Sequence, residues 1–236
     1  MASALREAGW GVCPPDQYIP DMDSGFMELW RQAEPYTMIS IERAWALAQA
    51  AVYVCRSNIA GDVVECGVWR GGSCLLAAQI LANENNSEKN LWLYDTFEGM
   101  PEPGGEDCIA SSGQPVKEKN PQGWWAVSLK AVKQNLRDST LAADRFKFIQ
   151  GRVEDTLKTR YPEQISLLRL DTDWYESTRC EMEVLYPRLS SGGVLIIDDY
   201  GHFTGARKAV DEYFQHRGII PLLHRSDYTG RVMVKP

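Results

Sequence analysis

The stretch GVLIIDDY, residues 193–200, is an apolar run that ends abruptly in two adjacent carboxylates. An almost wholly apolar run of this length is typical of a strand buried on both faces of a parallel sheet. The stretch ISLLRLDTD, residues 165–173, changes from apolar to acidic in the same way. Because ligands of open α/β sheets bind at the carboxyl ends of the strands, we expect Asp171, Asp198 and Asp199 to converge on one ligand-binding rim.

Three carboxylates on one rim repel one another unless something positive lies between them. A hard divalent cation such as Mg²⁺ takes oxygen ligands, so a metal site is the favoured interpretation of this trio. The alternative is that each acid caps the helix that follows its strand, which is the commoner role of a single Asp in that place. An acidic doublet joined by an acid from a second strand favours the metal.

The rest of the chain alternates short apolar segments with segments of helical periodicity. This order predicts an α/β, Rossmann-like, mostly parallel sheet with right-handed crossovers. A polar turn separates the last two apolar segments and predicts a closing antiparallel hairpin, which makes seven strands in all. Strands are expected at 62–66, 91–95, 146–151, 165–171, 193–198, 219–224 and 231–234, and helices at 38–56, 73–82, 125–137, 153–161, 176–189 and 204–217, with residues 190–193 ending the fifth helix.

Length and composition bound the class of protein. The chain has 236 residues, is 44% hydrophobic and carries a net charge of −7, which suits one large domain (61–236) preceded by a helical extension or lid (1–60). An acidic chain without basic runs is a poor ligand for nucleic acid or anionic membranes. The sequence shows no leader peptide and no apolar run of roughly 20 residues, so we expect a soluble, cytoplasmic protein. The six cysteines lack paired metal-site spacing and are expected to be reduced and mostly buried.

The turn after the first expected strand is rich in glycine. Gly67 and Gly71 allow close approach of a ligand to the backbone, and Ser73 opens a helix whose amides favour an anionic group. The spacing is not the dinucleotide fingerprint, because Trp69 stands where a second glycine would be needed. Asp95, at the end of the second strand, is suited to bind both hydroxyls of a ribose; its simpler interpretation is a cap or turn residue.

Four motifs in this order, ECGVWRGGS (65–73), YDTFEGMP (94–101), LDTDWYEST (170–178) and IDDYG (197–201), resemble the macrocin O-methyltransferase family. The resemblance extends from about residue 36 to residue 214. It implies a class I methyltransferase fold and methylation of sugar hydroxyls of natural products, with S-adenosylmethionine and Mg²⁺ as cofactors. It places Asp171, Asp198 and Asp199 on metal positions, and Met38, Glu65, Gly67, Gly71, Ser73, Asp95, Glu154 and Asp171 on cofactor positions, with Glu154 near the adenine.

Methyl transfer to an alcohol also needs a base. Related catechol methyltransferases have a lysine shortly after the first metal Asp, where this chain has Trp174. His202 has a suitable pKa range and follows the acidic doublet closely, although an exposed loop histidine is more often simply solvated. Asp173 is a second candidate, with helix capping as its simpler role. Asp171 is a third, since it can relay the proton while binding metal.

Several residues near these motifs have open interpretations. Trp174, beside the acids, is expected to line an acceptor pocket, whereas Trp124 and Trp125 are expected in the core. Arg43 is able to reach the site from its helix, although a surface ion pair with Glu42 is the more ordinary reading. The irregular segment 101–123 is expected to be a lid or a substrate-binding loop.

We expect a homo-oligomeric enzyme that methylates a sugar diol. Within methyltransferases, a catechol is the alternative acceptor. Two functions from other classes compete with this interpretation. A nicotinamide-dependent oxidoreductase is disfavoured by the glycine spacing and because no tyrosine is followed four residues later by lysine. A non-catalytic binding module is disfavoured by the acidic trio, since an abandoned metal site would have nothing to offset its repulsion.

Overall fold

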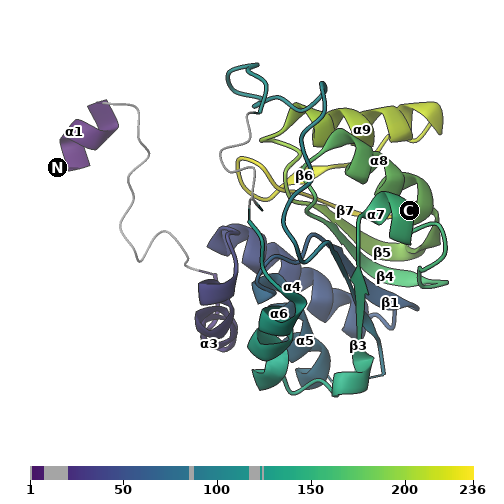
Figure 1. Cartoon of the computed structure of the whole chain (residues 1–236). Coiled ribbons are helices and arrows are strands. Elements are labelled where there is room, and N and C mark those ends of the chain that lie inside the picture. The colour runs from purple at the N-terminus through teal and green to yellow at the C-terminus, as the bar shows by residue number, and fades with distance from the viewer. Residues whose placement is uncertain (1, 8–20, 85–87, 117–122, 124) are drawn as a thin grey trace.

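The computed structural model describes residues 2–7, 21–84, 88–116, 123 and 125–236. Its centre is a seven-stranded sheet with the order β3-β2-β1-β4-β5-β7-β6 (Figure 1). The first five strands pair in parallel, whereas β7 runs antiparallel to β5 and to β6. The predicted mostly parallel sheet with an antiparallel end is confirmed. The strands are β1 Asp62–Cys66, β2 Leu91–Asp95, β3 Phe146–Gln150, β4 Ile165–Leu170, β5 Leu189–Ile197, β6 His224–Arg225 and β7 Arg231–Val234.

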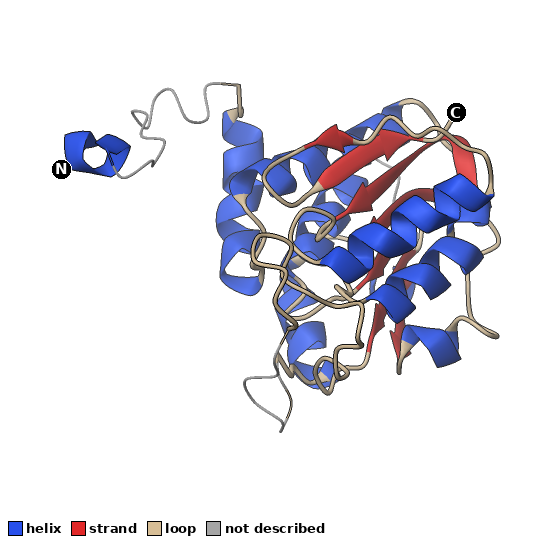
Figure 2. Cartoon of the chain, turned by 90° about the horizontal axis from the view of Figure 1, so that it is seen from above, coloured by secondary structure: helices blue, strands red, loops and turns tan. Residues whose placement is uncertain are grey.

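Helices cover both faces of the sheet (Figure 2). Neighbouring strand residues point to opposite faces. Val63 therefore packs with α3 to α6, whereas Val64 packs with α7 to α9. The described helices are α1 Ala2–Glu7, α3 Ser24–Ala33, α4 Ile41–Arg56, α5 Gly72–Asn83, α6 Leu129–Asn135, α7 Val153–Thr156, α8 Tyr175–Val184 and α9 Thr204–His216. Among the described residues, none of these helices has the length and apolarity that crossing a bilayer requires.

Some expected boundaries were wrong. Residues 190–193 do not end a helix, because β5 already begins at Leu189 and a shift in its register with β4 accommodates the extra residues. The strand expected at 219–224 is reduced to β6, of two residues. Ile220 is 98% exposed and Leu222 is 86% exposed, and Pro221 between them lacks the amide proton that a strand pairing needs. Apolar character alone therefore misled the prediction there.

The carboxyl edge of the sheet forms a continuous rim. The Asp171 amide donates to the Cys66 carbonyl at 2.8 Å, and the Asp198 amide donates to the Leu170 carbonyl at 2.9 Å. Gly67, at the end of β1, has φ +86°, and a Cβ there would lie 2.0 Å from the Asp171 carbonyl oxygen. Only glycine fits this contact, which brings the β1 turn against the acidic end of β4.

The cysteines that the structure describes are free thiols. Cys55, Cys66 and Cys74 are buried, and burial raises the pKa of each thiol above its ordinary value. This agrees with the prediction of reduced, mostly buried cysteines.

Candidate active site

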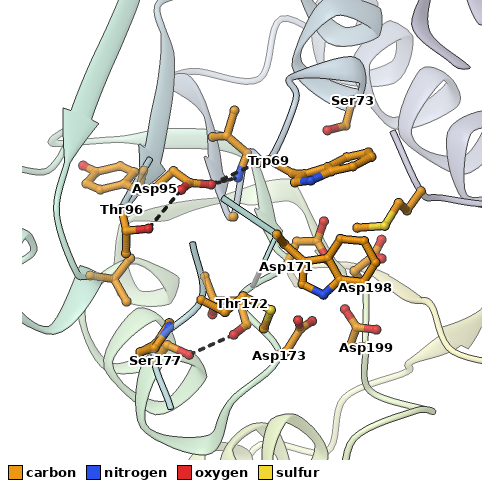
Figure 3. A pocket seen from close by; sticks show the side chains of 18 of the residues that line it. Trp69, Ser73, Asp95, Thr96, Asp171, Thr172, Asp173, Ser177, Asp198 and Asp199 are labelled. Atoms are coloured by element: carbon orange, nitrogen blue, oxygen red, sulfur yellow. Dashed lines mark hydrogen bonds between the residues drawn. The ribbon is translucent and has the colours of Figure 1, made fainter. Parts of the chain in front are cut away.

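A cavity of about 390 Å³ lies at the carboxyl edge of the sheet (Figure 3). Its wall combines the glycine turn after β1, the ends of β2, β3, β4 and β5, and a segment that precedes α4. The sequence-predicted site residues in this wall are Met38, Gly67, Ser73, Asp95, Glu154, Asp171, Asp173, Asp198, Asp199 and His202. Residues from both halves of the chain therefore meet at one cavity, as expected for an open α/β sheet.

Four acidic side chains gather on one side of this cavity (Figure 3). One carboxylate oxygen from each of Asp171, Asp173 and Asp199 lies within 4.8 Å of the others, which is a suitable spacing for a shared cation. Asp198 is at the same edge, but its carboxylate has other partners. The tight oxygen cluster therefore contains Asp173, which the sequence analysis assigned to proton transfer rather than to metal binding.

The pKa values of these acids reflect crowding. Burial raises the pKa of Asp173 to about 7; a hydrogen bond with Asp199 opposes the rise, and the charges of Asp171 and Asp198 add to it. Burial and neighbouring acids also raise the pKa of Asp171 and of Asp199 well above the ordinary value. Without a cation, the cluster therefore retains protons near neutral pH.

Arg169 is the cation at the base of the cluster. It is a β4 residue whose side chain is 2% exposed. Its Nη1 donates to Glu65 Oε1 at 2.7 Å and to Asp171 Oδ2 at 2.8 Å, and its Nη2 donates to Asp198 Oδ1 at 2.5 Å. One guanidinium thus holds carboxylates from the ends of β1, β4 and β5 in a fixed arrangement.

Arg43 is a second cation at this edge, and its interpretation as a surface residue paired with Glu42 was wrong. Its side chain is 13% exposed, its Nη1 donates to Asp198 Oδ2, and its Nε lies 3.0 Å from Asp227 Oδ2. The expectation that an abandoned acidic cluster would have nothing to offset its repulsion was also wrong, because Arg43 and Arg169 supply positive charge.

Glu65, at the end of β1 beside the glycine turn, is 2% exposed. Its carboxylate accepts a hydrogen bond from the Ser73 hydroxyl, in addition to that from Arg169. Gly71, with φ +87°, is the residue before α5, which begins at Gly72, one residue earlier than predicted. Ser73 lines the cavity, whereas Glu65 and Gly71 lie outside its lining.

Asp95 lies across the cavity from the acidic cluster (Figure 3). Its Oδ2 accepts hydrogen bonds from the amides of Val68 at 2.7 Å and Trp69 at 3.0 Å, and its Oδ1 accepts one from Phe97 at 2.7 Å. Asp95 therefore fastens the glycine turn to the end of β2, and it lines the cavity as well. Its two proposed roles, turn residue and ribose ligand, are compatible.

The capping interpretation of Asp173 was wrong. The residue has φ +67°, and the amide of Tyr175, at the start of α8, donates instead to Asp107 Oδ1 at 2.9 Å. Asp107 belongs to the irregular segment 101–116, and a backbone bridge from Ile109 to Phe203 fastens that segment beside the cavity. The side chain of Asp173 is therefore left to the acidic cluster.

His202 lines the cavity next to the acids. Its Nδ1 lies 3.4 Å from the Tyr228 hydroxyl. Burial and the nearby charge of Arg43 lower the pKa of His202, so the ring is neutral near pH 7 and able to accept a proton.

The tryptophans exchange their expected roles. Trp174 is 3% exposed, its Nε1 donates to the Pro101 carbonyl at 2.9 Å, and it packs against Phe203, so it belongs to the core rather than to the cavity wall. Trp125 is 46% exposed and lines the cavity with Trp69, whose ring it meets edge-on at 6.2 Å. Trp124 lies outside the described residues.

Sequence reasoning missed Arg169, Asp107 and the role of Arg43. A signal existed for Arg169, since an arginine inside an otherwise apolar strand is almost never buried without a charged partner. Asp171 follows it by two residues on the same strand end. Asp107 and Arg43 offered no comparable signal, because their partners are 68 and 155 residues away.

Comparison with known proteins gives a consistent result. The pattern that describes the macrocin O-methyltransferase family matches residues 28–235. The chain is 36% identical over 181 residues to demethyldecarbamoylnovobiocin O-methyltransferase of Streptomyces niveus, covering 77% of this chain and 68% of the relative. It is 35% identical over 211 residues to 8-demethyl-8-(2,3-dimethoxy-alpha-L-rhamnosyl)-tetracenomycin-C 4'-O-methyltransferase of Streptomyces olivaceus, covering 89% and 80% of the two chains.

A solved structure, that of the O-methyltransferase NovP, superposes with a TM-score of 0.76 at 34% identity, and the match covers 85% of this chain and 82% of NovP. The agreement therefore holds for the sequence and for the three-dimensional fold. This chain belongs to the macrocin O-methyltransferase family and is an O-methyltransferase.

Proposed function

We propose that the protein transfers the methyl group of S-adenosylmethionine to a hydroxyl of a sugar diol in a glycosylated natural product, with Mg²⁺ bound at the acidic cluster. The observation that carries this proposal is the convergence of Asp171, Asp173 and Asp199 on the wall of the cavity that also contains the glycine turn and Asp95. The rhamnosyl group in the name of the Streptomyces olivaceus relative supports a sugar as acceptor.

The acidic cluster fits a magnesium ion by its chemistry. It offers only carboxylate oxygens, which are the ligands that hard divalent cations prefer, and its crowded acids have raised pKa values that a cation would relieve. We propose Asp171, Asp199 and Asp198 or Asp173 as the ligands. When bound, Mg²⁺ would hold two acceptor oxygens and lower the pKa of the reacting hydroxyl.

The other end of the cavity fits S-adenosylmethionine, which supplies a methyl group on a sulfonium. Asp95 lines the cavity and would accept hydrogen bonds from a ribose, and the amides that open α5 would favour a carboxylate. Glu154 would lie near the adenine, and Met38 would cover the cofactor. Glu65, Gly67, Gly71 and Ser73 would shape its binding turn.

The base is assigned to the acid cluster or to His202. Neutral His202 matches the working range of a general base, Asp173 lies in the same acidic cluster, and Asp171 would act only while holding the metal. If His202 is the base, His202→Gln lowers kcat by about 10² to 10⁴ and removes the acidic limb of the pH–rate profile. If kcat falls by less than threefold, the assignment passes to Asp173.

The test is direct methyl transfer. The protein is incubated with methyl-labelled S-adenosylmethionine, Mg²⁺ and either an aryl rhamnoside or catechol, and the product is identified by mass spectrometry. We expect label on the rhamnoside, and we expect EDTA or Asp199→Asn to abolish it, while the exposed control Asp155→Asn retains it. Methylation of catechol alone would show that the acceptor is a catechol rather than a sugar diol.

Membership of an O-methyltransferase family disfavours both rival functions, a nicotinamide-dependent oxidoreductase and a non-catalytic binding module. We also propose that residues 1–60 act as a helical extension or lid of the methyltransferase domain at 61–236. Sedimentation of the purified chain tests the expected homo-oligomer.

A further inference from the structure

Arg43 links the N-terminal part of the chain to the acidic rim. It lies in the first turn of α4, whose N-terminal cap is Ser40. The Ser40 hydroxyl donates to Asp227 Oδ2 at 2.8 Å, and Arg43 Nε approaches the same oxygen at 3.0 Å. Asp227 also accepts hydrogen bonds from the amides of Thr229 and Gly230, so the turn before β7 holds it in place. Asp227 therefore anchors one side of the Arg43 guanidinium.

The other side of the guanidinium contacts Asp198. Arg43 Nη1 donates to Asp198 Oδ2, while Arg169 Nη2 donates to Asp198 Oδ1 at 2.5 Å. Asp198 is 2% exposed. Of the four described acids of the rim, it is the one whose two carboxylate oxygens each contact a guanidinium. Asp171 shares one oxygen with Arg169, and within the described part of the chain neither arginine forms an ion pair with Asp173 or Asp199. The carboxylate oxygens that lie within 4.8 Å of one another belong to Asp171, Asp173 and Asp199 instead.

We propose that Arg43 is a displaceable counter-ion, which occupies Asp198 Oδ2 in the metal-free protein and competes with a divalent cation for that oxygen. This inference rests on the proposed metal-dependent function. Arg169 is fully enclosed and holds three carboxylates, so it stays with the acids in both states. Arg43 keeps Asp227 as an anionic partner when Asp198 turns to the metal, which lowers the cost of the exchange.

The exchange couples metal binding to the wall of the cavity. Arg43 Nη2 donates to the Met38 carbonyl at 3.4 Å, and Thr37, Met38 and Ile39 line the cavity. Release of Asp198 therefore changes the partners of a guanidinium that contacts this segment directly. Arg43 acts here as a positioning residue, because it determines whether Asp198 is available as a ligand.

Competition for a ligand has a measurable signature. Removal of the competitor tightens metal binding, and a coupling of the usual size corresponds to a change of about fivefold or more in the dissociation constant. Loss of one positive charge near a cation site also tightens binding by simple electrostatics. The two effects differ when Asp198 is absent, because competition for its oxygen then disappears while the electrostatic effect remains.

The experiment is a double-mutant cycle on the full chain, with Mn²⁺ as the probe and binding followed by electron paramagnetic resonance and calorimetry, without S-adenosylmethionine. The proteins are wild type, Arg43→Met, Asp198→Asn and the double variant. Arg56→Met, which removes the same charge from the exposed end of α4, is the matched control. Arg43→Gln replaces Arg43→Met if circular dichroism shows that the latter is unfolded.

We expect Arg43→Met to bind Mn²⁺ at least about fivefold more tightly than wild type and Arg56→Met to match wild type. In the Asp198→Asn background, Arg43→Met should tighten binding clearly less, because only the electrostatic effect of the lost charge remains. Weaker or unchanged binding by Arg43→Met, or the same tightening in both backgrounds, overturns the inference while the metal site stands. Absence of Mn²⁺ binding to wild type overturns the proposed metal dependence itself, and the inference with it.

Discussion

Asp173→Asn should stabilise the metal-free protein at neutral and alkaline pH. Asp173 has a pKa of about 7 in the folded protein, against an ordinary value of 3.8, because it is buried beside Asp171 and Asp198. An acid with a raised pKa in the folded state keeps its proton to higher pH than the unfolded chain does. Stability contributed by the protonated form is therefore present at acidic pH and is lost as the pH rises from about 4 to about 7.

The size of the effect follows from the shift in pKa. A rise from 3.8 to about 7 corresponds to about 4 kcal/mol in the free energy of unfolding at high pH, at about 1.4 kcal/mol per pKa unit. Between pH 5 and pH 8 the loss is about 2 to 3 kcal/mol. Asparagine does not titrate, and it tolerates the left-handed backbone at this position, where φ is +67°. The stability advantage of the variant should therefore grow by that amount.

The assay is urea unfolding of wild type and variant at pH 5 and pH 8 in EDTA, analysed by linear extrapolation. The control is Asp155→Asn, because Asp155 is exposed and its pKa is lowered by Lys158, so this variant should gain no advantage at pH 8. A stability difference between Asp173→Asn and wild type that stays the same at both pH values would refute the reasoning. Saturating Mg²⁺ should stabilise wild type more than the variant.

Four further substitutions test other parts of the structure. Arg169→Met should cost about 3 to 5 kcal/mol in urea unfolding, because three carboxylates lose their common cation, and a loss below 1 kcal/mol would contradict this role. Gly67→Ala should give no cooperative unfolding transition, since its Cβ would lie 2.0 Å from the Asp171 carbonyl oxygen; a folded variant would show that the turn adapts. Trp174→Ala should lose about 3 to 5 kcal/mol of stability, because Trp174 is buried. Trp125→Ala should leave the melting temperature nearly unchanged and raise KM for the acceptor, because Trp125 is exposed and lines the cavity. The reverse pattern would restore the assignments made from sequence.

The sheet was predictable because its strands are short, apolar and separated by helical periodicity. All five parallel strands lie where the sequence placed them, apart from the early start of β5. The errors occurred at segments whose pattern is ambiguous. Residues 219–224 are apolar but exposed, and residues 190–193 resemble a helix end although they belong to β5. In both places the decision depends on partners that no local pattern contains.

The wall of the site was predictable for a related reason. Chemistry-bearing residues at the ends of parallel strands must lie on one edge, so the strand pattern alone brought Asp171, Asp198 and Asp95 to the cavity. The side-chain roles were less predictable. Trp174 follows the acids in sequence but turns into the core, whereas Trp125, in a glycine-containing turn, lines the cavity.

The sequence by itself determined the fold class, the acidic rim and the family, because each depends on residue type and spacing within short segments. Only the tertiary structure decided how the charges are paired. Arg43 and Asp198 are 155 residues apart, and the Arg43–Asp227 pair joins α4 to the turn before β7. Electrostatic energy depends on distance and burial rather than on separation along the chain, so the balance of two arginines against four acids exists only once the chain has folded.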